Sequence, residues 1–215
     1  MFKTAVATCL LAALAPGTGL PGGGGKRYIL YQHGRIVQQE QSARPKHAEF
    51  GYYELVEIVK TLRERGFEVV DGIRPKSATV EESADRAVAQ VRELLASGVP
   101  ADHITVLGAS MGASITFEAS AKLGEPQVRF GILGACLSTN LASLIRDGKK
   151  PQGRFLSVRE ESDEMSAPCA DWKPESPPAG LVAREIVVRT GLRHGYIYRP
   201  LPEWVDPIVA FARAD

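Results

Sequence analysis

A serine near the middle of the chain stands in a pattern that is suited to nucleophilic chemistry. Gly108-Ala109-Ser110-Met111-Gly112 matches G-x-S-x-G, in which a serine occupies a sharp turn from a strand into a helix. Glycines suit the flanking positions because side chains there would collide as the chain reverses. An apolar run at residues 104–107 precedes the pattern and a helical pattern follows it, as the motif requires. The pattern predicts a nucleophilic Ser110; a plain glycine turn is the alternative.

A nucleophilic serine needs a base that takes its proton, and the base needs an acid that orients it. The chain holds four histidines. His103 precedes the strand of Ser110 and is expected at the opposite edge of a parallel sheet, whereas His194 follows the last predicted strand, on a loop that returns to the edge of the serine. His33 ends the first strand, but Gly34 beside it favours a turn. We therefore predict His194 as the general base; an exposed loop histidine is the alternative.

The orienting acid is expected after one of the strands between the serine and the histidine. Glu160, Glu161 and Asp163 follow the apolar part of one such strand, at the edge where Ser110 is expected. Asp163 lies farthest into the loop, and we predict it as the acid. Glu160 is the rival, and an ordinary surface carboxylate is the alternative for each of them.

The elements that position these residues are predicted from short β-rich runs that alternate with longer helical patterns. The runs lie at residues 28–34, 67–75, 104–107, 128–136, 153–162 and 183–191. Strands separated by segments of helical length predict βαβ units, and hence a mostly parallel sheet of six strands with helices on both faces. In such sheets functional residues gather at the carboxyl ends of the strands. The sequence therefore predicts a three-layer α/β domain over residues 28–215.

The helical segments have separate signals. Predicted helices lie at residues 50–66, 79–98, 113–124 and 202–214, with a shorter one at 137–151, whereas the polar run 35–47 is predicted as a loop. The first helix presents Leu55, Val56, Val59 and Leu62 as its apolar face. The second opens with Thr79 three residues before Glu82, which is typical of a capping box. In the last helix, Pro207 is expected near the first turn.

The order Ser110, Asp163, His194 along the chain is similar to that of the α/β-hydrolases. From residue 28 to residue 214 the chain resembles a small member of that family, with the serine after the third strand, the acid after the fifth and the histidine after the sixth. The resemblance implies a serine hydrolase that cleaves an ester of a small acyl substrate through an acyl-enzyme. Thioesterases, amidases and peptidases use the same residues, so the sequence does not distinguish whether an ester, a thioester or an amide bond is cleaved.

The resemblance also implies two donors for an oxyanion hole. His33-Gly34 resembles the His-Gly turn of the family, which implies that the backbone N–H groups of Arg35 and Met111 face the oxyanion. A plain turn at the end of the strand is the alternative. The chain departs from the family in lacking a leading antiparallel hairpin, and a cap can occupy only residues 137–151. A minimal cap predicts an open site.

Other functions fit the sequence less well. A noncatalytic binding protein of the same fold is the main alternative. A G-x-G-x-x-G match at residues 17–22 follows no strand and opens no helix, and the chain has no Tyr-x-x-x-Lys, which argues against a dinucleotide site. Histidine and cysteine spacings do not match a zinc site. We therefore expect no cofactor and no metal. A net charge of +1 without charge runs does not favour nucleic acid, and the oligomeric state stays open.

The first 27 residues are predicted to be a signal peptide and a glycine-rich linker. One lysine precedes an apolar run at residues 5–15, which is too short to span a bilayer, and a Pro/Gly segment follows. This layout predicts export to the periplasm or the medium; a cytoplasmic protein is the alternative, and the cleavage point stays open. After export, Cys136 and Cys169 would remain. We predict a disulfide between them, with two free thiols as the alternative.

Overall fold

The computed structural model describes residues 25–134, 147–149, 151–166 and 181–214, without the side chains of 181–183. Six strands form one sheet: β1 (Arg27–Gln32), β4 (Phe67–Val70), β5 (Ile104–Ala109), β6 (Arg129–Leu133), β7 (Gly153–Glu160) and β8 (Leu181–Val188). Their order is β4-β1-β5-β6-β7-β8, and every neighbouring pair is parallel. The predicted six-stranded parallel sheet is confirmed.

Some predictions fall outside the described residues. They are the signal segment up to residue 24, both cysteines of the predicted disulfide, Cys136 and Cys169, and most of the predicted cap segment 137–151. These stay predictions.

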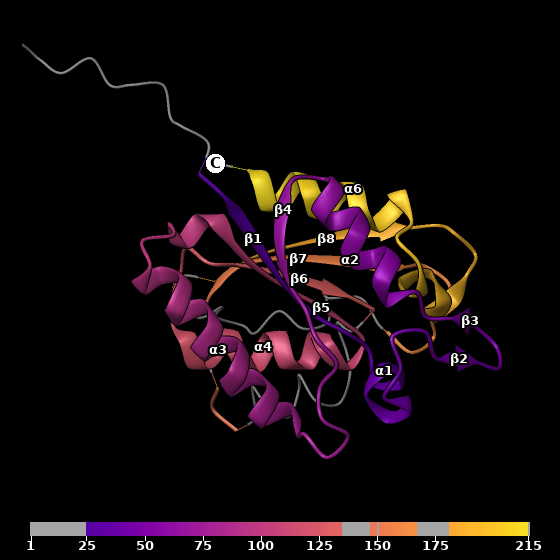
Figure 1. Ribbon diagram of the computed structural model, residues 1–215. Helices are drawn as coiled ribbons and strands as arrows, with labels where there is room; N and C mark the ends of the chain where they lie inside the picture. The colour runs from indigo at the N-terminus through magenta and orange to yellow at the C-terminus, as the bar shows by residue number, and fades with distance from the viewer. Residues whose placement is uncertain (1–24, 135–146, 150, 167–180, 215) are drawn as a thin grey trace, which may run out of the picture.

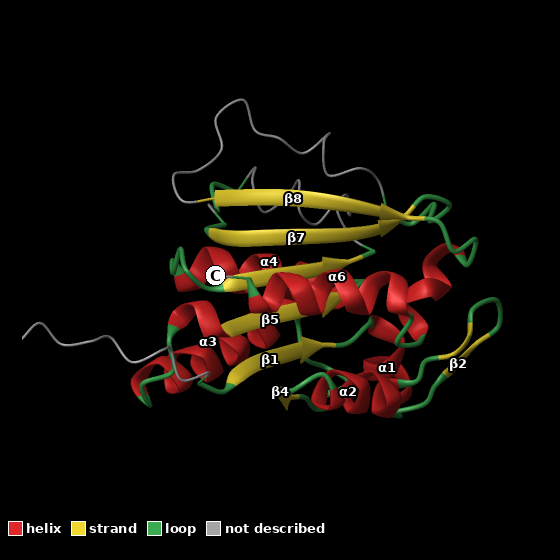
Figure 2. Ribbon diagram, turned by 90° about the horizontal axis from the view of Figure 1, so that it is seen from above, coloured by secondary structure: helices red, strands yellow, loops and turns green. Residues whose placement is uncertain are grey.

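Helices cover both faces of the sheet. Helices α2 (Leu55–Glu64) and α6 (Pro202–Arg213) lie on one face, and α3 (Val80–Ala96) and α4 (Met111–Leu123) lie on the other (Figures 1 and 2). The N-terminus of α3 has the predicted capping box, because the Thr79 hydroxyl accepts the Glu82 N–H at 3.1 Å and the Glu82 carboxylate accepts the Thr79 N–H at 2.8 Å. Among the described helices, none has the length and apolar composition of a membrane span.

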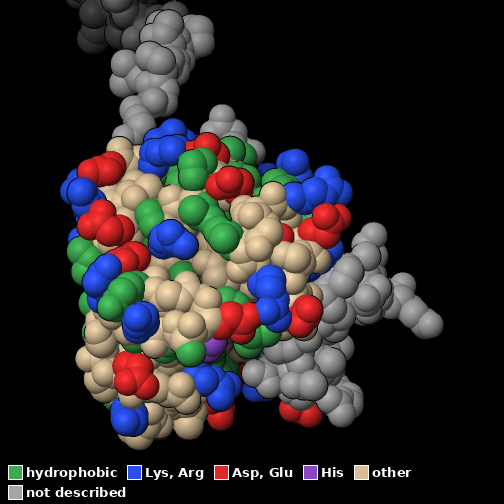
Figure 3. Space-filling model, turned by 90° about the vertical axis from the view of Figure 1, so that its right-hand side faces the viewer, with side chains coloured by type: hydrophobic (Ala, Val, Ile, Leu, Met, Phe, Trp, Pro, Cys, Tyr) green, Lys and Arg blue, Asp and Glu red, His purple; other side chains and the backbone are tan. Residues whose placement is uncertain are grey.

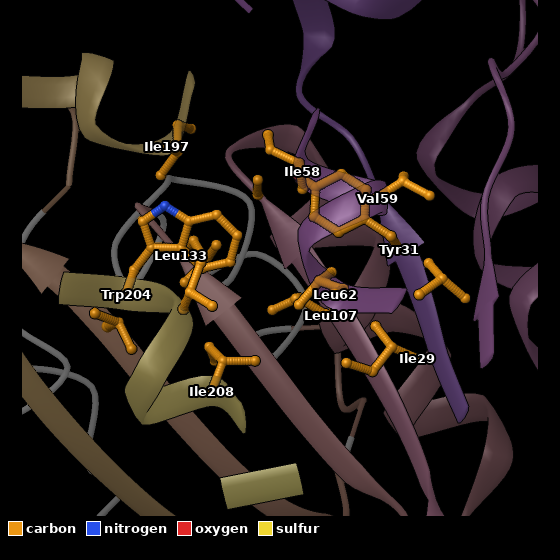
Figure 4. Close-up of a cluster of buried hydrophobic side chains, with 14 of the residues drawn as sticks. Ile29, Tyr31, Ile58, Val59, Leu62, Leu107, Leu133, Ile197, Trp204 and Ile208 are labelled. Atoms are coloured by element: carbon orange, nitrogen blue, oxygen red, sulfur yellow. The ribbon is translucent and has the colours of Figure 1, made fainter. Parts of the chain in front are cut away.

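The larger hydrophobic core lies between the sheet and the pair α2 and α6 (Figure 4). Helix α2 contributes Leu55, Ile58, Val59 and Leu62, whose spacing places them on one helical face. The inclusion of Val56 in this face was wrong, because it lies one position off the stripe and is 61% exposed. Trp204 of α6 is fully buried in the same cluster.

The chain differs from the prediction in the segment after β1. Residues predicted as a loop contain helix α1 (Arg35–Glu40), and a hairpin of β2 (Lys46–His47) and β3 (Gly51–Tyr52) follows. Helix α1 has a polar sequence and still buries Gln38, because the Gln38 amide donates to the carbonyls of Lys76 and Ala78. Side-chain hydrogen bonds to a distant loop leave no hydrophobic period in the sequence.

Helix α6 extends past its internal proline. Pro207 was predicted near the first turn, but it is the sixth residue of α6 and lies in the second turn. Trp204, Val205, Ile208 and Val209 are buried on both sides of it, so packing against the sheet continues the helix across a residue that lacks an N–H.

Candidate active site

Ser110 occupies the turn between β5 and α4 in a backbone conformation that is rare for a residue with a side chain. Its φ is 55° and its ψ is −119°, and such strain persists only where the surroundings impose it. The Ser110 N–H donates to the carbonyl of Leu133 at 2.9 Å, and the Ser110 carbonyl accepts from Ala113 at 2.8 Å. The neighbouring strand and the first turn of α4 thus hold the serine at the carboxyl end of the central strand.

The two glycines of the motif have no room for a side chain. A Cβ atom at Gly108 would lie 2.1 Å from the carbonyl oxygen of Gly112 and 2.4 Å from Thr116 Oγ1. A Cβ atom at Gly112 would lie 1.9 Å from the carbonyl oxygen of Gln32, in the adjacent strand β1. Glycine therefore lets α4 pack directly against β5 and the end of β1, as the sequence pattern predicted.

His194 and Asp163 are brought together at the same end of the sheet. His194 lies in the short 3-10 helix η3 (Arg193–Tyr198) after β8, and Asp163 lies in the loop after β7. Both side chains are buried, and His194 Nδ1 lies 2.8 Å from Asp163 Oδ2. An ionised carboxylate only accepts hydrogen bonds, so Nδ1 carries the proton and Nε2 keeps its lone pair. Met165 N–H and the Ser166 hydroxyl also donate to Asp163, each at 3.0 Å.

The structure does not bring Glu160, the rival acid, to His194. Its buried carboxylate accepts from the N–H and hydroxyl of Ser162, from the N–H and hydroxyl of Thr190 at 2.7 and 2.8 Å, and from the N–H of Gly191. Burial acts to raise the pKa of Glu160, but the hydrogen bonds from Thr190 and Ser162 outweigh it and lower that pKa. Glu160 thus joins the end of β7 to the loop that carries His194.

A cavity of about 430 Å³ opens at this end of the sheet. Its lining includes the predicted nucleophile Ser110, the predicted base His194, the predicted oxyanion donors Arg35 and Met111, and the turn residue Gly34. Apolar side chains such as Ile36, Phe50 and Ile197 form further parts of its wall. Figure 3 shows this side of the molecule, where histidine atoms are visible between hydrophobic and basic side chains. The cavity is large enough for a small organic molecule.

The proposed oxyanion donors start two helices that meet at the cavity. Arg35 is the first residue of α1 and Met111 is the first residue of α4, so neither N–H has a partner within its helix. A Cβ atom at Gly34 would lie 3.8 Å from Ser110 Cβ, which shows how closely the turn after β1 approaches the serine. No direct hydrogen bond joins the Ser110 hydroxyl to the His194 ring among the described residues. Such contacts are often long before substrate binds.

Known proteins with similar folds exist, although neither a family model nor a curated protein matches the sequence. SOBER1 of Arabidopsis thaliana aligns over 88% of this chain and 98% of its own, with a TM-score of 0.55 and 14% identity. A structure of the metagenome-derived lipolytic enzymes LipS and LipT aligns over 88% of this chain and 94% of its own, with a TM-score of 0.56 and 14% identity. Esterase Est22 aligns over 88% of this chain and 73% of its own, with a TM-score of 0.56 and 15% identity. The fold is that of the α/β-hydrolases. At such identities the likeness is one of fold.

Within this α/β-hydrolase fold, two other histidines lie away from the position of a base. His103 ends the short helix η1 (Ala101–His103) before β5, at the opposite edge of the sheet. His33 is buried, with Nδ1 2.9 Å from the Gly34 carbonyl and Nε2 accepting the Arg74 N–H at 3.1 Å. Burial and the charge of Arg74 lower the pKa of His33 to about 4. His33 is therefore a neutral member of the turn, as the glycine beside it suggested.

Two residues at the site have no signal in the sequence. Gly134 directly follows β6 with a φ of 63°, and a Cβ atom there would lie 3.1 Å from His194 Cε1 and 3.4 Å from Asp163 Oδ2. Arg74, in the loop after β4, is buried beside His33. Both contact residues that are far away in the sequence, so nothing in the local residue pattern indicates them. The described residues contain no group of three metal-ligating side chains.

Proposed function

We propose that this chain is a serine hydrolase that cleaves esters of small acyl groups. The observation that carries the proposal is the buried His194–Asp163 pair: His194 lines the same cavity as Ser110, and Ser110 has a strained backbone conformation. A histidine whose Nδ1 is held by a carboxylate presents Nε2 as a general base, and a serine in a strained turn is exposed to attack a substrate.

The proposed reaction has two halves. Ser110 Oγ attacks the acyl carbonyl while His194 Nε2 takes the hydroxyl proton, and Asp163 stabilises the imidazolium. The carbonyl oxygen becomes negative in the tetrahedral intermediate, where the N–H groups of Arg35 and Met111 stabilise it. His194 then gives the proton to the leaving alcohol. Water attacks the acyl-enzyme in the second half, with His194 again as base, and releases the acid.

The cavity supports small acyl groups as substrates. Its volume of about 430 Å³ is near the lower end for organic ligands. Ile36, Phe50 and Met165 line it and offer apolar contact near Ser110, Arg35 and His47 add polar groups, and none of the described lining residues is a carboxylate. Thioesters and amides would react by the same steps, and comparing their kcat/KM values with that of the matched ester assigns the bond.

Labelling with a fluorophosphonate tests the proposal directly. We expect the folded protein to be modified at Ser110, as read by peptide mapping, and to hydrolyse short p-nitrophenyl esters. Ser110→Ala should abolish both, whereas Ser97→Ala, which removes an exposed serine at the end of α3, should change neither. A folded wild-type protein without labelling and without turnover would favour a noncatalytic binding protein instead.

Export stays a prediction from the first 27 residues. If the mature protein is exported, the predicted bridge between Cys136 and Cys169 leaves no free thiol in the unreduced protein after removal of Cys9. A count of two free thiols would contradict the bridge.

A further inference from the structure

Arg74 is a buried cation without a carboxylate partner among the described residues. Its side chain donates from Nη2 to the His33 carbonyl at 2.7 Å and from Nε to Gln38 Oε1 at 3.1 Å, while Nη1 is buried without a partner. Only 4% of the residue is exposed. Buried arginines are usually paired with a carboxylate, because desolvation of an unpaired charge is costly. Arg74 keeps its charge here with neutral partners only.

The contacts of Arg74 belong to a network that holds the turn after β1. The Arg74 guanidinium donates to the His33 carbonyl, and the Arg74 backbone N–H donates to His33 Nε2 at 3.1 Å. The other ring nitrogen, Nδ1, must then carry the proton and donate to the Gly34 carbonyl at 2.9 Å. Tyr53 accepts the Gly34 N–H at 3.4 Å. Three successive polar groups of the turn, the His33 carbonyl and the N–H and carbonyl of Gly34, are therefore each held by a hydrogen bond.

The orientation of one peptide unit follows from this network. The bond between Gly34 and Arg35 is trans, since the described residues contain no cis peptide. In a trans peptide the C=O and N–H groups point in opposite directions. Because the Gly34 carbonyl points to the His33 ring, the Arg35 N–H points away from that ring. Arg35 lines the cavity together with Ser110.

We propose that Arg74 is a positioning residue for the oxyanion hole. This role rests on the proposed function, and Arg74 would act in two ways. Arg74 fixes the His33–Gly34 turn so that the Arg35 N–H faces the carbonyl oxygen of the substrate, and it places an uncompensated positive charge behind that donor. Both effects favour the transition state over the bound ester, because negative charge develops on the oxygen only during attack.

Replacing Arg74 separates this role from a structural one. In Arg74→Met we expect kcat for a short ester to fall about 10- to 100-fold with KM changed less than about threefold, since loss of a whole oxyanion donor costs about 100-fold or more. Affinity for a trifluoromethyl ketone that forms a tetrahedral adduct should fall by the same factor as kcat/KM. The melting temperature should fall only slightly, because removal of a buried unpaired charge offsets the loss of the hydrogen bonds to the His33 carbonyl and Gln38.

Two further variants control the experiment. Arg74→Lys keeps a charge but lacks the planar guanidinium fork that donates to His33 and Gln38, so we expect an intermediate kcat. Arg129→Met removes another fully buried arginine, at the opposite end of the sheet, and should leave kcat unchanged.

The outcomes are distinguishable. A wild-type protein that is neither labelled at Ser110 nor active overturns the proposed function and this inference with it. An active wild-type protein whose Arg74→Met variant keeps its kcat overturns this inference alone. The same holds if kcat and melting temperature fall in parallel while the affinity for the ketone is kept. If Arg74→Met does not fold, the inference is overturned when Arg74→Lys has the kcat of the wild type.

Discussion

The two sides of the cavity are held by buried groups of opposite charge. On the side of the turn after β1, Arg74 lies beside the neutral His33 without a carboxylate partner. On the other side, the loops after β7 and β8 enclose the carboxylates of Glu160 and Asp163. In the described part of the chain, hydroxyl, amide and imidazole groups bond these carboxylates, and no lysine or arginine does.

This difference matches the charge that ester cleavage would separate. Attack by a serine makes the carbonyl oxygen negative and the imidazole positive. In the arrangement proposed above, the cation lies behind the N–H that would face the oxygen; Asp163 contacts the imidazole directly. Charges that are already in place need no reorganisation during the reaction, which is why such arrangements lower barriers more than solvent does.

Removing the charge at Asp163 is expected to have the largest effect. In Asp163→Asn the amide no longer orients the His194 ring with a proton on Nδ1, so kcat should fall about 1,000-fold or more with little change in KM. Steady-state kinetics on a short ester measures the effect. Glu164→Gln changes an exposed neighbour and serves as control. A loss below tenfold for Asp163→Asn would mean that another group orients the base.

The sheet and the strained turn at Ser110 could be predicted because their signals are local. Apolar strands alternate with amphipathic helices, and the glycines of the serine turn follow from contacts that any tight strand-to-helix crossing makes. The choice between Asp163 and Glu160 was not local. Both follow β7, and only the path of the loop after β8 decides that one meets His194 and the other meets Thr190.

Arg74 could not be predicted from the sequence for a related reason. It lies 41 residues from its partner His33, in a loop without periodicity. Helix α1 escaped detection because it is only six residues long: Val37 alone of its apolar side chains is fully buried, and Gln38 joins the helix to that same loop. Contacts between distant polar residues leave no trace in local patterns.

Acid should destabilise the cationic side through His33. Its pKa is lowered to about 4 in the folded protein, against 6.5 when unfolded, so between these values the unfolded chain binds a proton that the folded protein does not. Stability must therefore fall as the pH falls through this range, by about 3 kcal/mol at about 1.4 kcal/mol per pKa unit. Urea unfolding of wild type and His33→Asn at several pH values measures the difference.

The expected result is a free-energy gap between the two proteins that changes by about 3 kcal/mol between pH 7 and pH 4. Tyr53→Phe, which keeps His33 in the same turn, should retain the wild-type slope. Parallel curves for wild type and His33→Asn would show that His33 binds its proton equally well in both states.

Glu160→Gln should lower stability more than it lowers the reaction rate. The carboxylate accepts bonds from Ser162, Thr190 and Gly191, and a glutamine would turn an NH₂ group toward one set of these donors. We expect a loss of about 2 kcal/mol in the free energy of unfolding and a fall in kcat of less than about tenfold. Above the ordinary pKa of a glutamate the loss is full, and it shrinks as the pH falls through the lowered pKa of the folded protein.

Denaturant unfolding and ester kinetics on one preparation separate the two buried carboxylates. If Glu160→Gln reduced kcat as much as Asp163→Asn does, the loop after β8 would depend on Glu160 to hold His194 in reach of Ser110. Asp163 would then remain the only assigned acid only if Glu160→Gln keeps the hydrogen bond between Asp163 and His194.

The smallest effect is expected at the rim, where both sides of the cavity carry exposed charges. Arg193, next to His194, pairs with Glu49 of the β2–β3 hairpin and with Glu164 of the loop after β7. Exposed ion pairs contribute about 0–1 kcal/mol, so Glu49→Gln should change stability by less than 1 kcal/mol and kcat/KM by less than about threefold. A fall in kcat/KM above tenfold, carried by KM, would contradict this, because it would mean that the hairpin with Phe50 closes on the substrate through Arg193.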